Sequence, residues 1–327
     1  MTGGAGFIGS HTSEALLQRR APVAIVDNLD DFYSVEWKRQ NLKDIRKSGE
    51  FQFYDADICD PVAMQKVFAD FRPTVVVHLA ARAGVRPSIE QPRAYEQTNV
   101  SGTFNLLEIS QGAGLRKFVF GSSSSVYGAT SRTPFSEDQV ELRPISPYAA
   151  TKLAGELICY TYAHLKGLPV VCLRFFTVYG PRQRPDLAIR KFTAYLEGGK
   201  PIPFFGDGQS GRDYTHVSDI VAGILSAVQF DAGRGGTVPF ETFNLGNSHP
   251  IKHSELVAML EKATGRKAML KVEEMQPGDV PITWADLRKA ERLLGYHPKV
   301  QMQEGLNDFV AWYRNFEASG KANPPSR

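Results

Sequence analysis

The sequence predicts an α/β fold in which a doubly wound parallel sheet carries a smaller, interleaved α/β lobe. Apolar segments of strand length alternate with amphipathic helical segments from Ala21 to Phe176, which is typical of a parallel sheet covered by helices on both faces. After Phe176 the chain changes to loops rich in proline and glycine with shorter helices. Its 327 residues, 42% of them hydrophobic, are enough for one large and one small domain.

Strands are predicted where short apolar runs lie between turn residues, since strands buried on both faces lose polar alternation. These runs are Val23–Asp27, Gln52–Asp55, Thr74–Leu79, Lys117–Ser122 and Val170–Phe176. Parallel pairing of such strands requires a crossover segment between each one and the next.

The segments between these strands are predicted to form helices, which would serve as the crossovers. Asp60 and Pro61 provide an N-cap and a first helical residue. Pro92–Gln111 predicts a second helix, and Pro147–Lys166 predicts a third that ends at Gly167.

The second lobe is predicted from the residues after Phe176. A helix at Val217–Phe230 and an apolar segment at Phe240–Leu245 are expected to return to the first sheet. The predicted division is a first domain of residues 1–176 with 216–244, and a second of residues 177–215 and 245–327.

A glycine-rich turn, Gly3, Gly6 and Gly9, stands at the head of a helix running to about Arg20. Such a turn allows close backbone approach, and the helix N-terminus attracts a pyrophosphate, although a flexible turn is an alternative. Asp27 ends the strand that follows, where its carboxylate can accept hydrogen bonds from ribose hydroxyls and repel a 2′-phosphate. Because no arginine follows it, the pattern favours NAD over NADP in a Rossmann-type domain.

The strand that should lead into this turn is missing, because the chain starts Met1-Thr2-Gly3. We expect the natural protein to carry several more residues upstream, with Met1 standing where an apolar strand residue belongs. An intact mass that established Met1 as the true start would contradict this expectation. A further alternative is that the short start makes this version inert.

Tyr148 and Lys152 stand four residues apart, on one face of a predicted helix. Ser146 and Pro147 place the tyrosine in the first turn, where the positive end of the helix dipole favours ionisation of the phenol. A solvated helix face would explain an isolated pair of this kind. The serines at 122–125 upstream make a hydride-transfer site the better interpretation.

Net charge, cysteine spacing and histidine spacing argue against nucleic-acid-binding, disulfide-bonded and metal-binding proteins. A formal net charge of +3 with pI about 8.6 is too mild to indicate nucleic-acid or membrane binding. Cys59, Cys159 and Cys172 lack paired spacing and are predicted to be buried thiols in a reducing cytoplasm. His78 and His216 lack the spacing of a metal site, so no metal is expected.

Several motifs together resemble the extended short-chain dehydrogenase/reductase family of NAD-dependent epimerases and dehydratases. They are Thr2–Gly9, Asp57-Ile58, His78–Ala81, Ser122–Gly128, Tyr148–Lys152 and Arg174–Pro181, in this order. Within that family the chain looks most like the UDP-glucuronate 4-epimerases, through Ala83–Arg86, Ser122–Gly128, Leu173–Pro181 and Arg184–Asp186.

The resemblance implies a catalytic triad of Ser123, Tyr148 and Lys152. A tyrosinate would take the proton of the sugar 4-hydroxyl while C4 passes hydride to NAD, and the ketone would then be reduced on its other face. It also implies a homodimer that pairs the helices Pro92–Gln111 and Pro147–Lys166, with NAD in the first domain and the nucleotide sugar in the second. The implied cofactor contacts are Gly3, Gly6, Phe7, Ile8, Gly9, Asp27, Asn28, Asp57, Ile58, Leu79, Ala80, Ala81, Asn99, Tyr148, Lys152 and Phe175.

Three hydroxyls beside this triad indicate the sugar. Related decarboxylases resemble Thr-Ser-Glu, with an acid where this chain has Ser125, and related dehydratases carry Asp-Glu where it has Ser124 and Ser125. Related UDP-galactose 4-epimerases typically carry asparagine where it has Thr177. Small hydroxyl donors suit a carboxylate at C6, which predicts UDP-glucuronate and UDP-galacturonate as the pair of sugars. We expect the hydroxyls to hold that carboxylate where the β-keto acid cannot lose CO2.

The UDP group is expected to meet basic residues at the substrate side of the site. Arg184 and Arg212 are predicted to bind the diphosphate, with Arg86 and Lys191 behind them, because guanidinium groups match phosphate oxygens. Asp279 is predicted to contact the uridine ribose, with a turn-forming aspartate as the alternative. Ser123, Ser124, Ser125 and Thr177 complete the predicted substrate site.

Two other functions stay open from the sequence. UDP-glucose or UDP-N-acetylglucosamine 4-epimerisation would use the same triad. A noncatalytic NAD-binding regulator is less favoured, because such proteins generally lose the Tyr148 and Lys152 pair.

Overall fold

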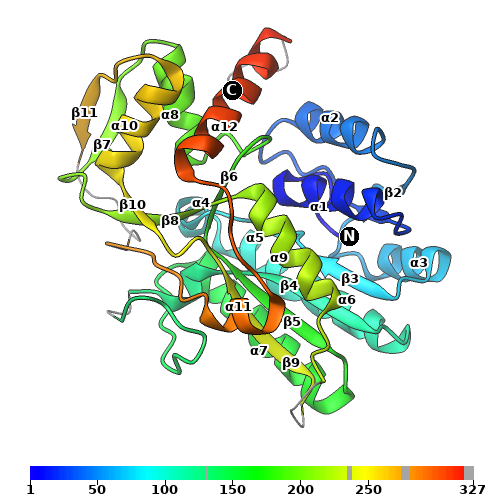
Figure 1. Cartoon of the computed structure of the whole chain (residues 1–327). Helices are drawn as coiled ribbons and strands as arrows, with labels where there is room; N and C mark the ends of the chain where they lie inside the picture. The colour runs from blue at the N-terminus through cyan, green and yellow to red at the C-terminus, as the bar shows by residue number, and fades with distance from the viewer. Residues whose placement is uncertain (130–131, 234–237, 274–279, 320–327) are drawn as a thin grey trace.

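The computed structural model describes residues 1–129, 132–233, 238–273 and 280–319. Its larger lobe contains a parallel sheet with helices packed on both faces, which confirms the predicted doubly wound fold class (Figure 1). The strand order is β2 (Gln52–Tyr54), β1 (Ala24–Val26), the N-terminal residues, β3 (Val75–His78), β4 (Lys117–Ser123), β5 (Val170–Phe175) and β9 (Phe240–Leu245). All five strands predicted from Val23 to Phe176 are confirmed, with ends that differ by one residue at most.

The first two residues complete the sheet between β1 and β3. Thr2 forms parallel bridges with Val26 and His78. The Thr2 N–H donates to the carbonyl oxygen of Val77 at 3.0 Å, and the Val26 N–H donates to that of Met1 at 2.8 Å. Met1 and Thr2 thus occupy the position that leads into the glycine turn, and the expectation of further upstream residues stays a prediction.

Helices cover both faces of this sheet, so apolar side chains are buried on each face. On one face lie α1 (Phe7–Gln18) and α9 (Val217–Gln229), with α2 (Val35–Ile45) beside α1. On the other lie α3 (Pro61–Phe71), α6 (Gly102–Gly112) and α7 (Pro147–Lys166). Neighbouring residues of one strand face opposite cores, as Phe118 and Val119 do.

The ends of α3 and α7 follow the predicted capping chemistry. Asp60 accepts hydrogen bonds from the N–H groups of Val62 and Ala63, and Pro61 is the first residue of α3. Ser146 accepts from the N–H of Ala149 before Pro147, and α7 ends at Gly167 with φ of 66°. The predicted bounds of α7 are therefore confirmed.

The segment predicted as one helix from Pro92 contains an irregular turn. It consists of α5 (Pro92–Glu96), a π-helical turn η1 (Gln97–Ser101) and α6. A π-turn often marks a functional position, because the extra residue redirects one side chain. Here the turn contains the buried side chain of Asn99.

Among the described residues, the smaller lobe contains two short sheets and three helices of ten or more residues. Its sheets are β10 (Pro250–Lys252), β8 (Gly211–His216) and β6 (Thr177–Tyr179), and β11 (Leu270–Glu273) with β7 (Ile202–Phe205). Its helices α8 (Ala188–Glu197), α10 (His253–Thr264) and α12 (Met302–Ala318) enclose a core of their own. The remaining short helices are α4 (Val85–Glu90), a 3-10 turn η2 (Ser124–Tyr127) and α11 (Arg288–Leu294).

The two lobes are interleaved along the chain, because β9 pairs with β5 after the chain has formed β6, α8, β7 and β8. The predicted helix at Val217–Phe230 is confirmed as α9, and the predicted apolar segment is β9. We propose the division into residues 1–176 with 216–244 and residues 177–215 with 245–327 on this basis.

One prediction about the thiols was wrong. Cys159 and Cys172 are buried and free, as expected, but Cys59 is free and partly exposed. The Cys59 N–H donates to Asp57 at 2.7 Å, which forms a turn ahead of α3 instead of regular structure. Within the part of the chain described, none of the helices has the length and apolar composition that crossing a membrane requires.

Candidate active site

A cavity of about 650 Å³ lies at the carboxyl ends of the parallel strands. Its wall combines the glycine turn, the residues after β1, β3 and β4, the start of α7, and side chains of the smaller lobe. Ligands of open α/β sheets bind at this edge, where helices and loops diverge. The structure therefore brings most of the predicted site residues to one place.

The glycine turn fits a dinucleotide pyrophosphate. A Cβ atom on Gly9 would lie 2.1 Å from the carbonyl oxygen of Gly3, so only glycine permits this approach. Gly6 precedes α1 without any side chain that caps it. The first-turn N–H groups of α1, where Phe7 and Ile8 line the cavity, are therefore available to an anion.

Asp27 closes the predicted adenosine end of the cavity. Its carboxylate accepts the N–H groups of Ala5 and Leu29, each at 3.0 Å, which ties it to the glycine turn. Burial raises the pKa of Asp27, while the nearby Lys38 ammonium acts in the opposite direction. The Asn28 side chain donates to Asp57 at 2.9 Å across the same end.

The predicted cofactor contacts line this cavity with one exception. Besides the glycine turn, these are Asp27, Asn28, Asp57, Ile58, Leu79, Ala80, Ala81, Tyr148, Lys152 and Phe175. Asn99 lies behind the wall, where its side chain donates to the carbonyl oxygen of Arg82 at 2.9 Å and to the hydroxyl of Thr151 at 3.0 Å. Its predicted contact with NAD stays a prediction.

Lys152 is buried and anchored to β4. Its ammonium donates to the carbonyl oxygen of Gly121 at 2.7 Å and lies 5.2 Å from the centre of the Phe120 ring. Burial lowers the Lys152 pKa from 10.5 to about 8, against a smaller opposing effect of nearby acidic groups.

Tyr148 lies half-buried in the cavity wall, beside Ser123. Burial raises the pKa of its phenol above the ordinary value of 10, whereas a hydrogen bond with Ser123 and the charge of Arg184 act to lower it. A phenol with this environment stays neutral at pH 7 until another positive charge arrives. A nicotinamide ring bound in the cavity would bring such a charge.

The serines after β4 form a connected group. The Ser125 hydroxyl donates to that of Ser123 at 2.9 Å, and the Ser125 N–H donates to the same oxygen at 3.2 Å. Ser123 thus also caps the 3-10 turn η2. Ser124, Ser125 and Thr177 all line the cavity, as predicted.

The predicted diphosphate residues are only partly brought together. Arg184 and Arg212 line the cavity. Arg184 pairs with Asp186 at 2.7 Å and donates to the carbonyl oxygen of Ala83 at 3.2 Å. Arg86 instead lies over the ring of Phe205 at 5.3 Å, and neither it nor Lys191 is among the lining residues described.

Asp279 falls outside the described residues, and its predicted contact with the uridine ribose stays a prediction.

Sequence reasoning missed several residues at the cofactor end. Asp30, Tyr33, Lys38 and Arg82 line the cavity. Arg82 pairs with Asp30 at 2.8 Å, and the Lys38 ammonium donates to the carbonyl oxygen of Asp30 at 2.6 Å. A helical lysine carries no signal of such a position, because the pattern resembles an ordinary solvated face.

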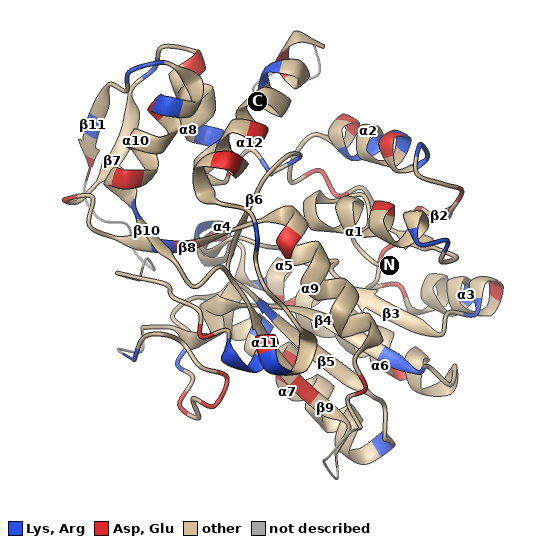
Figure 2. Ribbon diagram, in the orientation of Figure 1, with Lys and Arg blue, Asp and Glu red and all other residues tan. Residues whose placement is uncertain are grey.

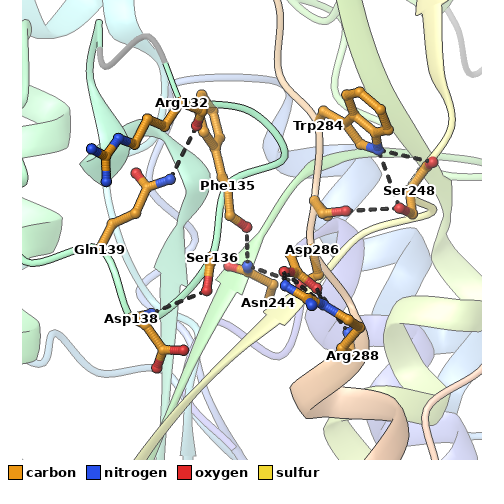
Figure 3. Close-up of polar contacts among 11 residues, drawn as sticks. Arg132, Phe135, Ser136, Asp138, Gln139, Asn244, Ser248, Trp284, Asp286 and Arg288 are labelled. Atoms are coloured by element: carbon orange, nitrogen blue, oxygen red, sulfur yellow. Dashed lines mark hydrogen bonds and ion pairs between the residues drawn. The ribbon is translucent and has the colours of Figure 1, made fainter.

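Phe135 was also missed, although it lines the cavity and stacks on Tyr127 with ring centres 4.7 Å apart. Figure 3 shows how this loop segment is held. The Phe135 carbonyl oxygen accepts the Asn244 side-chain amide at 2.8 Å and the Asp286 N–H at 2.9 Å. These partners are more than a hundred residues away in sequence, so local pattern could not identify them.

The described carboxylates that line the cavity are Asp27, Asp30 and Asp57, all on the side of the sheet formed by β1 and β2. The residues around Tyr148 contribute hydroxyls and an ammonium instead. No group of three His, Cys, Asp or Glu side chains in the described ranges could hold a metal ion.

Comparisons with known proteins agree with this geometry. A family model described as GDP-mannose 4,6 dehydratase matches residues 1–309. A UDP-glucuronate 4-epimerase of Thermodesulfobacterium geofontis is 42% identical over 313 residues, covering 95% of this chain and 94% of that protein.

Solved structures give similar matches. UDP-glucuronic acid 4-epimerase of Bacillus cereus, in complex with UDP-glucuronic acid and NAD, is 36% identical with a TM-score of 0.89, covering 96% of this chain and 98% of that one. UDP-glucose 4-epimerase of Thermotoga maritima with UDP-glucose is 34% identical with a TM-score of 0.87, covering 97% and 98%.

Proposed function

Because the chain belongs to the GDP-mannose 4,6 dehydratase family of NAD-dependent epimerases and dehydratases, we propose that it is a UDP-glucuronate 4-epimerase. It is an NAD-dependent isomerase that interconverts UDP-glucuronate and UDP-galacturonate. The observation that carries the proposal is the meeting of Ser123, Tyr148 and Lys152 with Ser124, Ser125 and Thr177 in one cavity.

The triad moves the proton. The Tyr148 phenolate takes the proton of the sugar 4-hydroxyl as C4 loses hydride, and it returns the proton when hydride comes back to the other face. Bound NAD supplies the hydride acceptor and then the hydride donor. Ser123 positions the reacting oxygen, and Lys152 provides a positive charge in the same wall.

The cofactor side of the cavity suits NAD. The Asp27 carboxylate would accept hydrogen bonds from the adenosine ribose and repel a 2′-phosphate. The glycine turn and the first turn of α1 would hold the pyrophosphate, with the remaining lining residues around the nicotinamide. Arg184 and Arg212 would bind the diphosphate of the UDP-sugar.

The sugar side suits a carboxylate that must be retained. Oxidation at C4 makes a β-keto acid, which loses CO2 most easily when the breaking bond aligns with the ketone π system. Ser124, Ser125 and Thr177 would hold the carboxylate out of that alignment through hydrogen bonds. Elimination of water is disfavoured because the described carboxylates of the cavity lie on the cofactor side.

UDP-glucose 4-epimerisation is the second candidate, favoured by the Thermotoga maritima structure with UDP-glucose. It needs the same triad but no partner for a C6 carboxylate. The three hydroxyls support the hexuronate, and the intact Tyr148 and Lys152 pair argues against a noncatalytic regulator.

The protein would act as a cytoplasmic homodimer. Apolar side chains are exposed along the outer face of α7 and on α6, namely Leu157 (61%), Tyr160 (45%), Leu165 (66%) and Phe104 (41%). Such a face of two neighbouring helices is suited to pairing with its copy in a four-helix arrangement. Three free thiols are compatible with a reducing compartment.

The test supplies UDP-glucuronate, UDP-glucose and UDP-N-acetylglucosamine separately to the purified protein with NAD, and resolves the products by NMR. We expect UDP-galacturonate from the first sugar at the highest kcat/KM, and no turnover by Tyr148→Phe. Preference for either neutral sugar would replace the proposal with the second candidate. No turnover of any sugar by the wild type would contradict both.

A further inference from the structure

A buried ion pair stands directly behind the proposed catalytic residues. The central strands β3, β4 and β5 carry almost no charged residues along their length (Figure 2), and Arg174 is the charged residue of β5. Its guanidinium donates to both carboxylate oxygens of Glu156 on α7, at 2.9 and 2.7 Å. Both residues are 5% exposed.

Glu156 continues the helical face that carries the proposed base. It follows Lys152 by four residues and Tyr148 by eight, so the three side chains lie along one side of α7. Each of them contacts β4. Tyr148 is hydrogen-bonded with Ser123, Lys152 with Gly121, and Glu156 accepts the Ser122 hydroxyl at 2.5 Å.

Arg174 links α7 to strand β5 and, through Tyr127, to Asn244 on β9. In the strand register it lies between Ser122 of β4 and Asn244 of β9. Its guanidinium lies over the Tyr127 ring at 4.8 Å, and the Tyr127 hydroxyl donates to the Asn244 side chain at 2.7 Å. Asn244 in turn holds the cavity-lining segment at Phe135, as Figure 3 shows.

Stability alone is a weak reason for such a pair. Removing two charges from water is costly, and apolar side chains of similar volume often serve a core equally well. A fork of two parallel N–H···O bonds, however, has only one good geometry. It fixes the position of α7 along its own axis and its rotation about that axis relative to β4. An apolar contact would allow α7 to slide or rotate slightly.

We propose that Glu156 and Arg174 are positioning residues, which hold α7 in the register that places Tyr148 and Lys152 opposite Ser123. The inference rests on the proposed function, because its effect appears in the epimerisation step. Neither residue lines the cavity among the residues described, so neither is assigned a contact with substrate or cofactor.

The test separates positioning from stability with a charge-free pair. Glu156→Leu combined with Arg174→Met removes both charges and leaves no unpaired ion, so the folded state is largely retained. We expect kcat on UDP-glucuronate to fall by about tenfold to 100-fold, because small misplacements of reacting groups have effects of this size. KM for UDP-glucuronate should stay within about twofold, since Arg184 and Arg212, the proposed diphosphate ligands, are untouched.

Two further variants keep the outcome clear. Arg174→Lys retains the charge but loses the fork, and it should reproduce the fall in kcat. Leu107→Ala in the neighbouring core of α6 provides a matched loss of thermal stability, and at a temperature well below its Tm it should leave kcat unchanged. If the double variant is itself destabilised, its kcat and that of Leu107→Ala are measured at temperatures the same number of degrees below their own Tm values.

Undiminished kcat in the charge-free pair, or an equal fall in Leu107→Ala, would overturn the positioning role. Absence of epimerisation by the wild type would instead count against the proposed function.

Discussion

The ammonium of Lys152 donates a 2.7 Å hydrogen bond to the backbone oxygen of Gly121, two residues before Ser123 on β4. The lysine is thereby fixed to the strand that carries the serine, although its own helix carries the tyrosine. Ionisation of Tyr148 is opposed by burial and favoured by Ser123 and Arg184. Without bound cofactor, the Tyr148 phenol is therefore protonated at neutral pH and does not act as a base.

Replacing Lys152 should show the cost of this buried charge. The net lowering of its pKa from 10.5 to about 8 corresponds to roughly 3 kcal/mol against the charged form in the folded state, and an unpaired Gly121 carbonyl costs about 1–3 kcal/mol. We expect Lys152→Met to abolish turnover yet gain about 1 kcal/mol of stability at pH 7. In the folded wild type Lys152 loses its proton near pH 8, whereas in the unfolded chain it does so near pH 10.5. The free energy of unfolding of the wild type therefore rises over this pH range, and the stability advantage of Lys152→Met becomes smaller. Denaturant unfolding at pH 7 and pH 9.5 measures both effects, and a less stable variant at pH 7 would contradict the reasoning.

The pH dependence of turnover should follow the phenol of Tyr148. Because burial raises its pKa, kcat/KM should increase as the pH rises from 6 through neutral. The hydrogen bond from Ser123 lowers that pKa, so Ser123→Ala should move the rising limb to more alkaline pH as well as reduce kcat. Initial rates of both proteins across this range provide the test. A shift toward acid would exclude the assigned role of the serine.

The fate of the sugar carboxylate should depend on Thr177. We expect Thr177→Ala to increase the fraction of UDP-pentose several-fold, since the β-keto acid can then align for loss of CO2. Ser124→Ala should act in the same direction. Quantification of UDP-galacturonate and UDP-pentose from one reaction gives the ratio, and an unchanged ratio in both variants would remove the hydroxyls from this role.

Arg212 should matter for binding more than for chemistry. Loss of charged hydrogen bonds to phosphate is worth about 1.5–3 kcal/mol, so Arg212→Gln should raise KM for the UDP-sugar by about tenfold to 100-fold. Lys200→Gln is a suitable control, because Lys200 is an exposed cation of the same lobe. Steady-state kinetics at saturating NAD would show the contrast, and equal effects on both variants would indicate nonspecific charge attraction instead.

The outer face of α7 should determine the oligomeric state. Leu157→Glu places a charge where a copy would bury an apolar side chain, and we expect a monomer in light scattering after size exclusion. Val272→Glu is the matched control, since Val272 is 73% exposed on β11 of the other lobe. A wild type that elutes as a monomer would contradict the proposed homodimer.

The fold could be predicted closely because its signals are local. Apolar runs identify the five strands, and caps such as Ser146 and Gly167 define α7 without tertiary information. The same holds for the core of the site, since Tyr148 and Lys152 are fixed by helical spacing and the glycine turn by its own steric requirement.

The rest of the cavity depends on long-range packing that a sequence pattern does not contain. Phe135 reaches the wall through contacts with Asn244, and Lys38 through the backbone of Asp30. Conversely, Arg86 has the residue type for phosphate binding, but it lies over Phe205 because α4 directs it there. Residue type indicates what a side chain can bind, and only the packed fold determines what it reaches.

The late pairing of β9 with β5 also has a consequence for how the molecule is made. Val170 has its partner at Phe240, so during synthesis the edge of β5 stays open while the ribosome translates the first part of the other lobe. Exposed strand edges can pair with other nascent chains. Between the emergence of Phe175 and that of Leu245, the edge of β5 is therefore open to such pairing. A break in the chain within this interval would separate parts of both lobes.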